Sequence, residues 1–179
     1  GGTGVANTGL VEAAQARMQA ADGNLYALAI NQSGMVRATG TATVDGRIVL
    51  TAAGGTVRQD GTLAARNADG SGGSILVGGD ARGGNRAVPN AATTLVTANA
   101  VMDASAAQGD GGRVVVWADG ATRFAGRIAA RAGGTGGDGG FVEVSGKREL
   151  AFEPAAPLDL SAPRGKVGTY KSGGTRLAI

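Results

Sequence analysis

Residues 109–117 read GDGGRVVVW, and residues 137–146 repeat the phrase as GDGGFVEVSG. A glycine followed by an apolar run occurs in four copies, which begin at residues 46, 73, 112 and 140. A shorter phrase that ends in alanine precedes each copy, and its copies begin at residues 34, 61, 100 and 126. The second phrase follows the first at a nearly constant spacing in every copy, so one repeat unit contains both.

A third apolar patch follows each copy of the second phrase, at residues 57, 95–96, 124 and 150–152. All three segments are short, favour β-branched side chains and are bounded by Gly, Asp, Asn or Ser, which is typical of short strands. Three short strands in about 27 residues correspond to one coil of a parallel β-helix. The 179 residues therefore predict one all-β domain over 1–179, with about six to seven coils stacked at the spacing of paired strands.

One step of the repeat is longer than the others, by about twelve residues. Gly, Asn and Pro cluster in ARGGNRAVPNAA, residues 81–92, so we expect a loop excursion there. A degenerate last copy reads LDLSA at 158–162 and GKVGTY at 165–170. The tail at 171–179 is expected to cap the last coil or to stack on another molecule.

Residues 10–21, LVEAAQARMQAA, favour a helix by local propensity. The repeat assigns GLVEA and ARMQA in this stretch to strands instead. We follow the repeat because stacking on a neighbouring coil overrides a small propensity difference, but the helix stays an alternative.

The composition fits a narrow coil with sharp corners. Glycine supplies 34 residues and aromatic residues only 3% of the chain, so small and β-branched side chains must fill the interior. We expect the corners to need a positive φ, which glycine adopts without strain. Five of the Asp-Gly pairs are assigned to these corners, and these five begin at residues 22, 45, 69, 110 and 138.

The absence of Cys and His excludes thiol and histidine nucleophiles, histidine bases and ordinary zinc sites. The net charge of +3 comes from scattered residues with few aromatic neighbours, so we expect no nucleic-acid binding. No apolar run is long enough for a membrane helix, so we expect no membrane insertion.

GGTGGDGGF at 133–141 is similar to a calcium-binding nonapeptide, but Gly140 stands where a large apolar residue belongs and no tandem copy follows. We interpret it as a glycine-rich corner and expect no cofactor or metal.

Two carboxylate pairs could serve a glycan-cleaving β-helix, namely Asp103 with Glu143 and Glu149 with Glu153. No spacing forces either pair together, so solvated faces or corners are the expected places for them. Alternation puts Val142 and Val144 on one face of their strand and Glu143 on the outer face.

Arg47 and Arg113 occupy equivalent repeat positions, with Ser74 between them in order. We expect an exposed column along the solenoid, which could bind an anionic sugar or a partner or simply keep the surface soluble. Val115 is expected to be buried, so that an Asp there would unfold the neighbouring coils.

Four stretches carry a family resemblance: GNLYALAINQSGMVRATG (23–40), GRIVLTAAGGTV (46–57), DASAAQGDGGRVVVWADGATRFAGRIAARAGG (103–134) and GDGGFVEVSGKRELAF (137–152). Together they resemble filamentous-haemagglutinin-like exoproteins of the two-partner secretion type, over about residues 9–169. The chain departs from the family where YKSGGTRLAI (170–179) replaces an apolar run into Asp-Pro, and where the N-terminal secretion domain is missing. It therefore resembles either the C-terminal part of the β-helix passenger or a compact family member whose ends are free.

The resemblance implies a right-handed parallel β-helix that leaves a Gram-negative cell through an outer-membrane β-barrel transporter. It implies a secreted or cell-surface role in adhesion, in filaments or in haem acquisition. The matching motifs are scaffold motifs, so they transfer no catalytic, cofactor-binding or metal-binding residues.

Two classes of function follow. In the first, the chain is a non-catalytic structural or adhesive module that contacts a surface glycan or host receptor, and its end coils stack head to tail into a filament if residues 1–10 and 177–179 leave them uncapped. In the alternative, it is a glycan-binding or glycan-cleaving β-helix.

Overall fold

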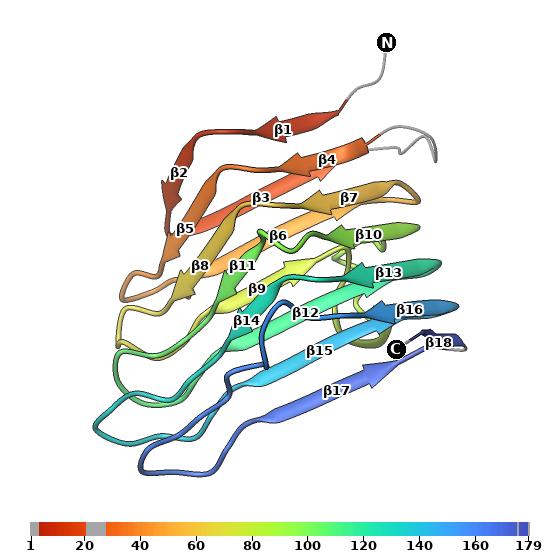
Figure 1. Cartoon of the computed structure of the whole chain (residues 1–179). Helices are drawn as coiled ribbons and strands as arrows, with labels where there is room; N and C mark the ends of the chain where they lie inside the picture. Colours follow the sequence, from red (N-terminus) through yellow and green to blue (C-terminus); the bar gives the residue numbers. More distant parts are fainter. Residues whose placement is uncertain (1–3, 21–27, 175, 179) are drawn as a thin grey trace.

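The computed structural model describes residues 4–20, 28–174 and 176–178. Strands of three kinds recur in the same order, and each pairs in parallel with its equivalent in the next coil (Figure 1). The coils descend from β1 at the N-terminal end to β17 and β18 at the C-terminal end, with the three sheets running along the stack.

We name the sheets A, B and C in the order in which each coil visits them. Sheet A contains β1 (Val5–Asn7), β4 (Leu28–Gln32), β7 (Thr56–Gln59), β10 (Thr93–Val96), β13 (Ala121–Phe124), β16 (Glu149–Phe152) and β18 (Arg176–Ala178). Sheet B contains β2 (Leu10–Ala13), β5 (Met35–Thr39), β8 (Thr62–Arg66), β11 (Val101–Asp103) and β14 (Arg127–Ala129). Sheet C contains β3 (Gln15–Ala20), β6 (Arg47–Ala52), β9 (Ser74–Val77), β12 (Arg113–Ala118), β15 (Phe141–Gly146) and β17 (Thr169–Gly173). The prediction of an all-β, right-handed parallel β-helix of six to seven coils is confirmed.

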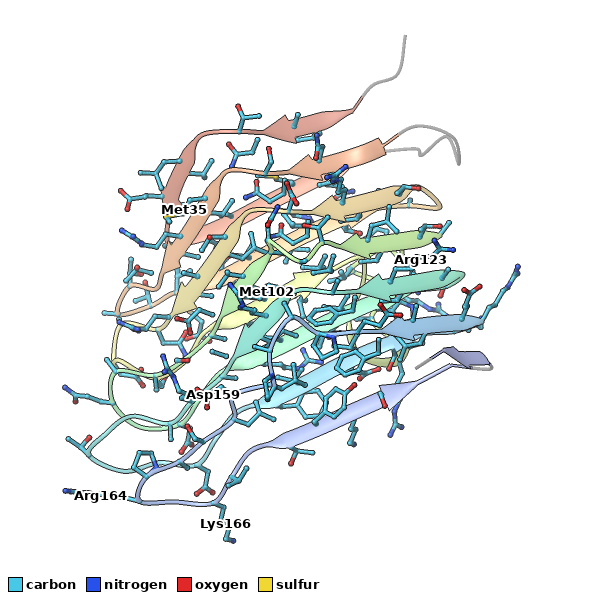
Figure 2. All side chains as sticks on the ribbon, in the orientation of Figure 1. Met35, Met102, Arg123, Asp159, Arg164 and Lys166 are labelled. Atoms are coloured by element: carbon cyan, nitrogen blue, oxygen red, sulfur yellow. The ribbon has the colours of Figure 1, made fainter. Side chains whose placement is uncertain are left out.

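The core is a set of columns in which alternate side chains of successive coils stack on one another. In sheet C one interior column contains Ile48, Ile75, Val114 and Val142. Met102 lies inside the coil, whereas Arg164 and Lys166 project from the turn of the last coil (Figure 2). Burial of such columns supplies the main stabilisation, because each coil alone has too little apolar surface to fold.

Strands also form in the ambiguous N-terminal stretch. Leu10–Ala13 pairs with β5, and Gln15–Ala20 pairs with β6 over six residues. The helix alternative is therefore wrong for residues 10–20, because pairing with the next coil outweighs local propensity. Residue 21 and the Asp22-Gly23 pair lie outside the described residues.

The register of the last coil differs from the prediction. The expected phrase GKVGTY at 165–170 does not form a strand from its start, because β17 begins at Thr169 and Thr169 pairs with Phe141. The phrase therefore opens at Gly168, three residues later than expected. LDLSA contributes a single parallel bridge, from Asp159 to Ala129.

The glycine that opens the second phrase lies at a close approach between coils. A Cβ on Gly112 would lie 2.1 Å from the carbonyl oxygen of Gly73, and one on Gly140 would lie 2.0 Å from that of Gly112. The same carbonyls accept the N–H groups of Arg113 and Phe141 at 2.9 Å. We call this column the glycine ladder, and it comprises Gly46, Gly73, Gly112, Gly140 and Gly168.

The expected positive φ at the Asp-Gly corners occurs only in part. Gly70 has a φ of 88°, whereas Gly46, Gly111 and Gly139 have no positive φ. At these three positions a Cβ would lie within 2.2 Å of a backbone carbonyl oxygen. Lack of space, rather than turn conformation, therefore requires glycine there.

The long step of the repeat leaves the coil as an excursion from Gly79 to Asn90, which includes a 3-10 turn, η1 (Ala81–Gly83). Val88 of the excursion packs on the outer face of sheet C. It covers Val49, Leu76, Val115 and Trp117, which form a second apolar cluster outside the coil. Val115 is buried as expected, but it lies under the excursion and not in the coil interior. A charge at this position is therefore expected to displace the excursion and not to unfold the neighbouring coils.

Candidate functional surface

The predicted column forms at the start of the sheet C strands. Arg47, Ser74 and Arg113 occupy one register position in successive coils, and Phe141 and Thr169 continue the column. The column was expected to be exposed, but Arg47, Ser74 and Arg113 are half-buried because they lie in a groove and not on a flat face. They line an open groove of about 1020 Å³ along the stack.

The two arginines of the column have different surroundings. The Arg113 guanidinium lies 2.6 Å from a carboxylate oxygen of Asp80, and 5.9 Å from the ring centroid of Phe141. Among the described residues, the Arg47 guanidinium has no hydrogen-bond or ion-pair partner. Arg47 is therefore the cation of this column that is available to a ligand, whereas Arg113 fastens the excursion.

Asp80 anchors the start of the excursion. Burial raises the pKa of Asp80, but hydrogen bonds from the Asn85 amide, the Ala81 N–H and Arg113, with the Arg113 charge, bring that pKa below its ordinary value of 3.8. Such a carboxylate stabilises the folded excursion above its unfolded pKa of about 3.9, and the contribution is lost as pH falls through the lower folded pKa.

We expect the excursion to loosen below about pH 4, with a red shift of Trp117 fluorescence, because Trp117 is the only tryptophan and lies beneath it. Glu143 and Asp119 also contact the excursion, and their protonation could loosen it as well. The acid transition of the unaltered chain is therefore compared with that of Asp80→Asn, in which the part of the fluorescence change caused by protonation of Asp80 should be missing. An identical acid transition in both proteins would contradict this role of Asp80.

The two predicted carboxylate pairs are not brought together in a groove. Asp103 lies in sheet B, and its Oδ1 accepts the Ser105 N–H at 2.8 Å, whereas Glu143 lies in sheet C. Glu149 begins β16 and Glu153 follows its end. Neither Glu149 nor Glu153 lines the groove of the arginine column.

Glu143 differs from its expectation in one respect. It faces outward as predicted, but it is only 3% exposed, because the excursion covers it and the Arg82 N–H donates to its Oε1 at 3.1 Å. The expected solvated position is therefore wrong. Sequence alternation shows the face of a strand but not what a distant loop lays over it.

A hollow beside the excursion was not anticipated from the sequence. It has a volume of about 640 Å³ and lies between the excursion, β15 and β17. Its floor contains Glu143 and Ser145, and its walls include Trp117, Arg82 and Lys171. The long step at residues 81–92 was the available signal, because a loop on a flat sheet creates a wall.

The aspartates near the calcium-like motif connect the coils. Asp110 Oδ1 accepts the Asp138 N–H and Asp138 Oδ1 accepts the Lys166 N–H, both at 2.8 Å. No group of three acidic, His or Cys side chains that could hold a metal ion occurs within the described ranges. In the same part of the chain, no helix has the length and apolar character of a membrane span.

Comparison with known proteins gives no further assignment. No family model matches the chain, and no curated protein matches it. The resemblance to filamentous-haemagglutinin-like exoproteins therefore stays a prediction that rests on the quoted phrases.

Proposed function

We propose that the chain is a non-catalytic β-helix scaffold of a secreted or cell-surface exoprotein of the two-partner secretion type, exported from a Gram-negative cell through an outer-membrane transporter. The scaffold displays its outer faces for adhesion and accepts further coils at its ends. The observation that carries the proposal is the unbroken register of three parallel sheets, which leaves backbone groups of the outermost strands available for pairing.

The last strand of sheet C illustrates such an edge. All five residues of β17 are exposed, and β15 is its pairing partner. The Thr169 N–H donates to Gly140, so by the alternation of a parallel strand the N–H groups of Tyr170 and Ser172 point away from β15. Another coil could therefore add at this edge, and in the purified 179-residue chain it would come from a second copy.

If a second copy adds at this edge, each column of residues in register continues from the last coil of one copy into the first coil of the next. Some of the residues that become neighbours in this way attract one another, and others repel. In sheet A, Val5 of the next copy would follow Leu177, which places two apolar residues in register. In sheet C, Arg17 would follow Lys171, which places like charges side by side. In sheet B, Glu12 would follow Asp159, whose place in the last coil is visible in Figure 2.

Head-to-tail association should therefore depend on salt. Two like-charge contacts at the strand spacing cost about 1 kcal/mol each in water, and raising the salt from about 20 mM to about 500 mM screens them. We expect monomers at low salt and short rods at high salt, measured by sedimentation velocity and negative-stain electron microscopy. Arg17→Glu should associate already at low salt, and Arg17→Gln should be intermediate.

The edge itself is tested with a second pair of variants. Ser172→Pro removes an outward N–H without removing a hydrogen bond to β15, and should abolish the rods. Ser172→Ala keeps that N–H and should retain them. A chain that stays monomeric at all salt and protein concentrations, Arg17→Glu included, would refute stacking through the end coils.

A further inference from the structure

The hollow beside the excursion combines buried polar groups with a positively charged rim. Glu143 is 3% exposed and Ser145 is 4% exposed, and both line the hollow. The carboxylate of Glu143 uses Oε1 to accept the Arg82 N–H, and within the described residues neither Glu143 Oε2 nor the Ser145 hydroxyl has a hydrogen-bond partner. Polar groups that a fold has largely removed from water favour a ligand that hydrogen-bonds to them.

The charges around the hollow define the rest of the ligand. Lys171 is the register neighbour of Glu143 but forms no ion pair with it among the described residues, and its Nζ lies 5.7 Å from the ring centroid of Phe141. Arg82 also lines the hollow, so two cations lie beside one carboxylate. This balance favours a ligand with its own negative charge.

The volume of the hollow and its apolar wall indicate the size and kind of ligand that it could hold. Trp117 is 8% exposed beneath the excursion and contributes only its accessible part to one wall, and it is held in place because its Nε1–H donates to Asp119 Oδ1 at 3.1 Å. An indole packs well against the C–H face of a ring. The volume of about 640 Å³ suits one or two sugar rings rather than a long polymer.

We propose that this hollow binds an acidic sugar residue of a glycan. The ring hydroxyls donate to Glu143 Oε2 and exchange hydrogen bonds with Ser145, and the ring packs against Trp117. The sugar carboxylate lies toward Lys171 and Arg82. This inference specifies the adhesive part of the proposed function, but it needs no stacking of coils, so each can fail without the other.

Trp117 provides a direct measurement, because it is the only tryptophan in the chain and lines the hollow. The purified full chain is titrated with N-acetylneuraminic acid and glucuronic acid, with N-acetylglucosamine and glucose as neutral sugars and acetate as a charge without a ring. We expect the acidic sugars to change Trp117 fluorescence saturably and to bind at least tenfold more tightly than the neutral sugars or acetate.

Three variants locate the binding. Lys171→Gln should weaken acidic-sugar binding about tenfold with little effect on neutral sugars, and Glu143→Gln should weaken both kinds because it removes a charged acceptor. Arg123→Gln removes an exposed cation from the outer face of sheet A and should leave binding unchanged. Circular dichroism melting of each variant confirms that it is folded before its affinity is compared.

Three results would overturn the assignment. One is the absence of saturable binding of any acidic sugar, and another is equal binding of acetate, which would indicate a simple anion site. The third is a loss of affinity in Arg123→Gln as large as that in Lys171→Gln, which would indicate attraction to the overall positive charge.

Discussion

Replacing Gly112 by Ala should destabilise the protein by about 3 kcal/mol, because the new methyl group has no space between two coils. A Cβ there would lie 2.1 Å from the carbonyl oxygen of Gly73 and 2.8 Å from that of Ala104. Both contacts are with backbone, which cannot rotate away. The Gly73 carbonyl also accepts the Arg113 N–H, so any displacement weakens the pairing of β9 and β12.

Gly134→Ala is the matched control. A Cβ on Gly134 has no atom within 4 Å, and its φ is not positive. We expect its stability to change by no more than about 0.5 kcal/mol, with a small gain from the reduced freedom of the unfolded chain. Thermal melting should show a fall of about 10 °C for Gly112→Ala, by the usual relation for a domain of this size, and almost none for Gly134→Ala. Equal melting temperatures would contradict the glycine ladder.

The adjacent residues Val114 and Val115 should respond very differently to aspartate. Both are fully buried. Val114 belongs to the interior column with Ile75 and Val142, where a carboxylate would have neither water nor a partner. Burying such a charge costs several kcal/mol, so Val114→Asp should lose the β signal in circular dichroism.

Val115→Asp should be a local change. Val115 lies under the excursion, in register with Leu76 and Glu143. Its new charge, repelled by Glu143, can reach water if the excursion lifts from the sheet. We expect the β signal to persist while Trp117 fluorescence shifts to the red. Global unfolding of both variants, or an unchanged Trp117 signal in Val115→Asp, would contradict this division into two clusters.

The repeat predicts most of the fold because every coil must meet the same requirements. Each turn places apolar residues inward at the same offsets, so phrases such as those at 46–50 and 112–116 reveal both strand and register. The last coil is less predictable, because β17 reads TYKSG and has few β-branched residues. There the ladder position of Gly168 decides the register, which apolar pattern alone does not show.

The candidate site is less visible in the sequence than the scaffold. The Arg47–Ser74–Arg113 column follows from the repeat, because residues at equivalent positions must align. The burial of Glu143 does not follow from it, because the covering excursion lies about 60 residues earlier in the chain. Sequence periodicity describes what the coils have in common, whereas this hollow depends on an excursion that departs from the repeat.

The in-register stacking of coils is tested most directly by proximity across two of them, in a chain that has no cysteine of its own. Leu95 and Arg123 pair in adjacent strands of sheet A and lie 28 positions apart in the sequence. With cysteines at both positions, a short bifunctional thiol reagent should cross-link them rapidly, because paired strands are about 4.8 Å apart. Cysteines at Leu95 and Ala121, two residues out of register, should react at least tenfold more slowly. Equal rates for the two pairs, or no cross-link in the first, would contradict the parallel β-helix.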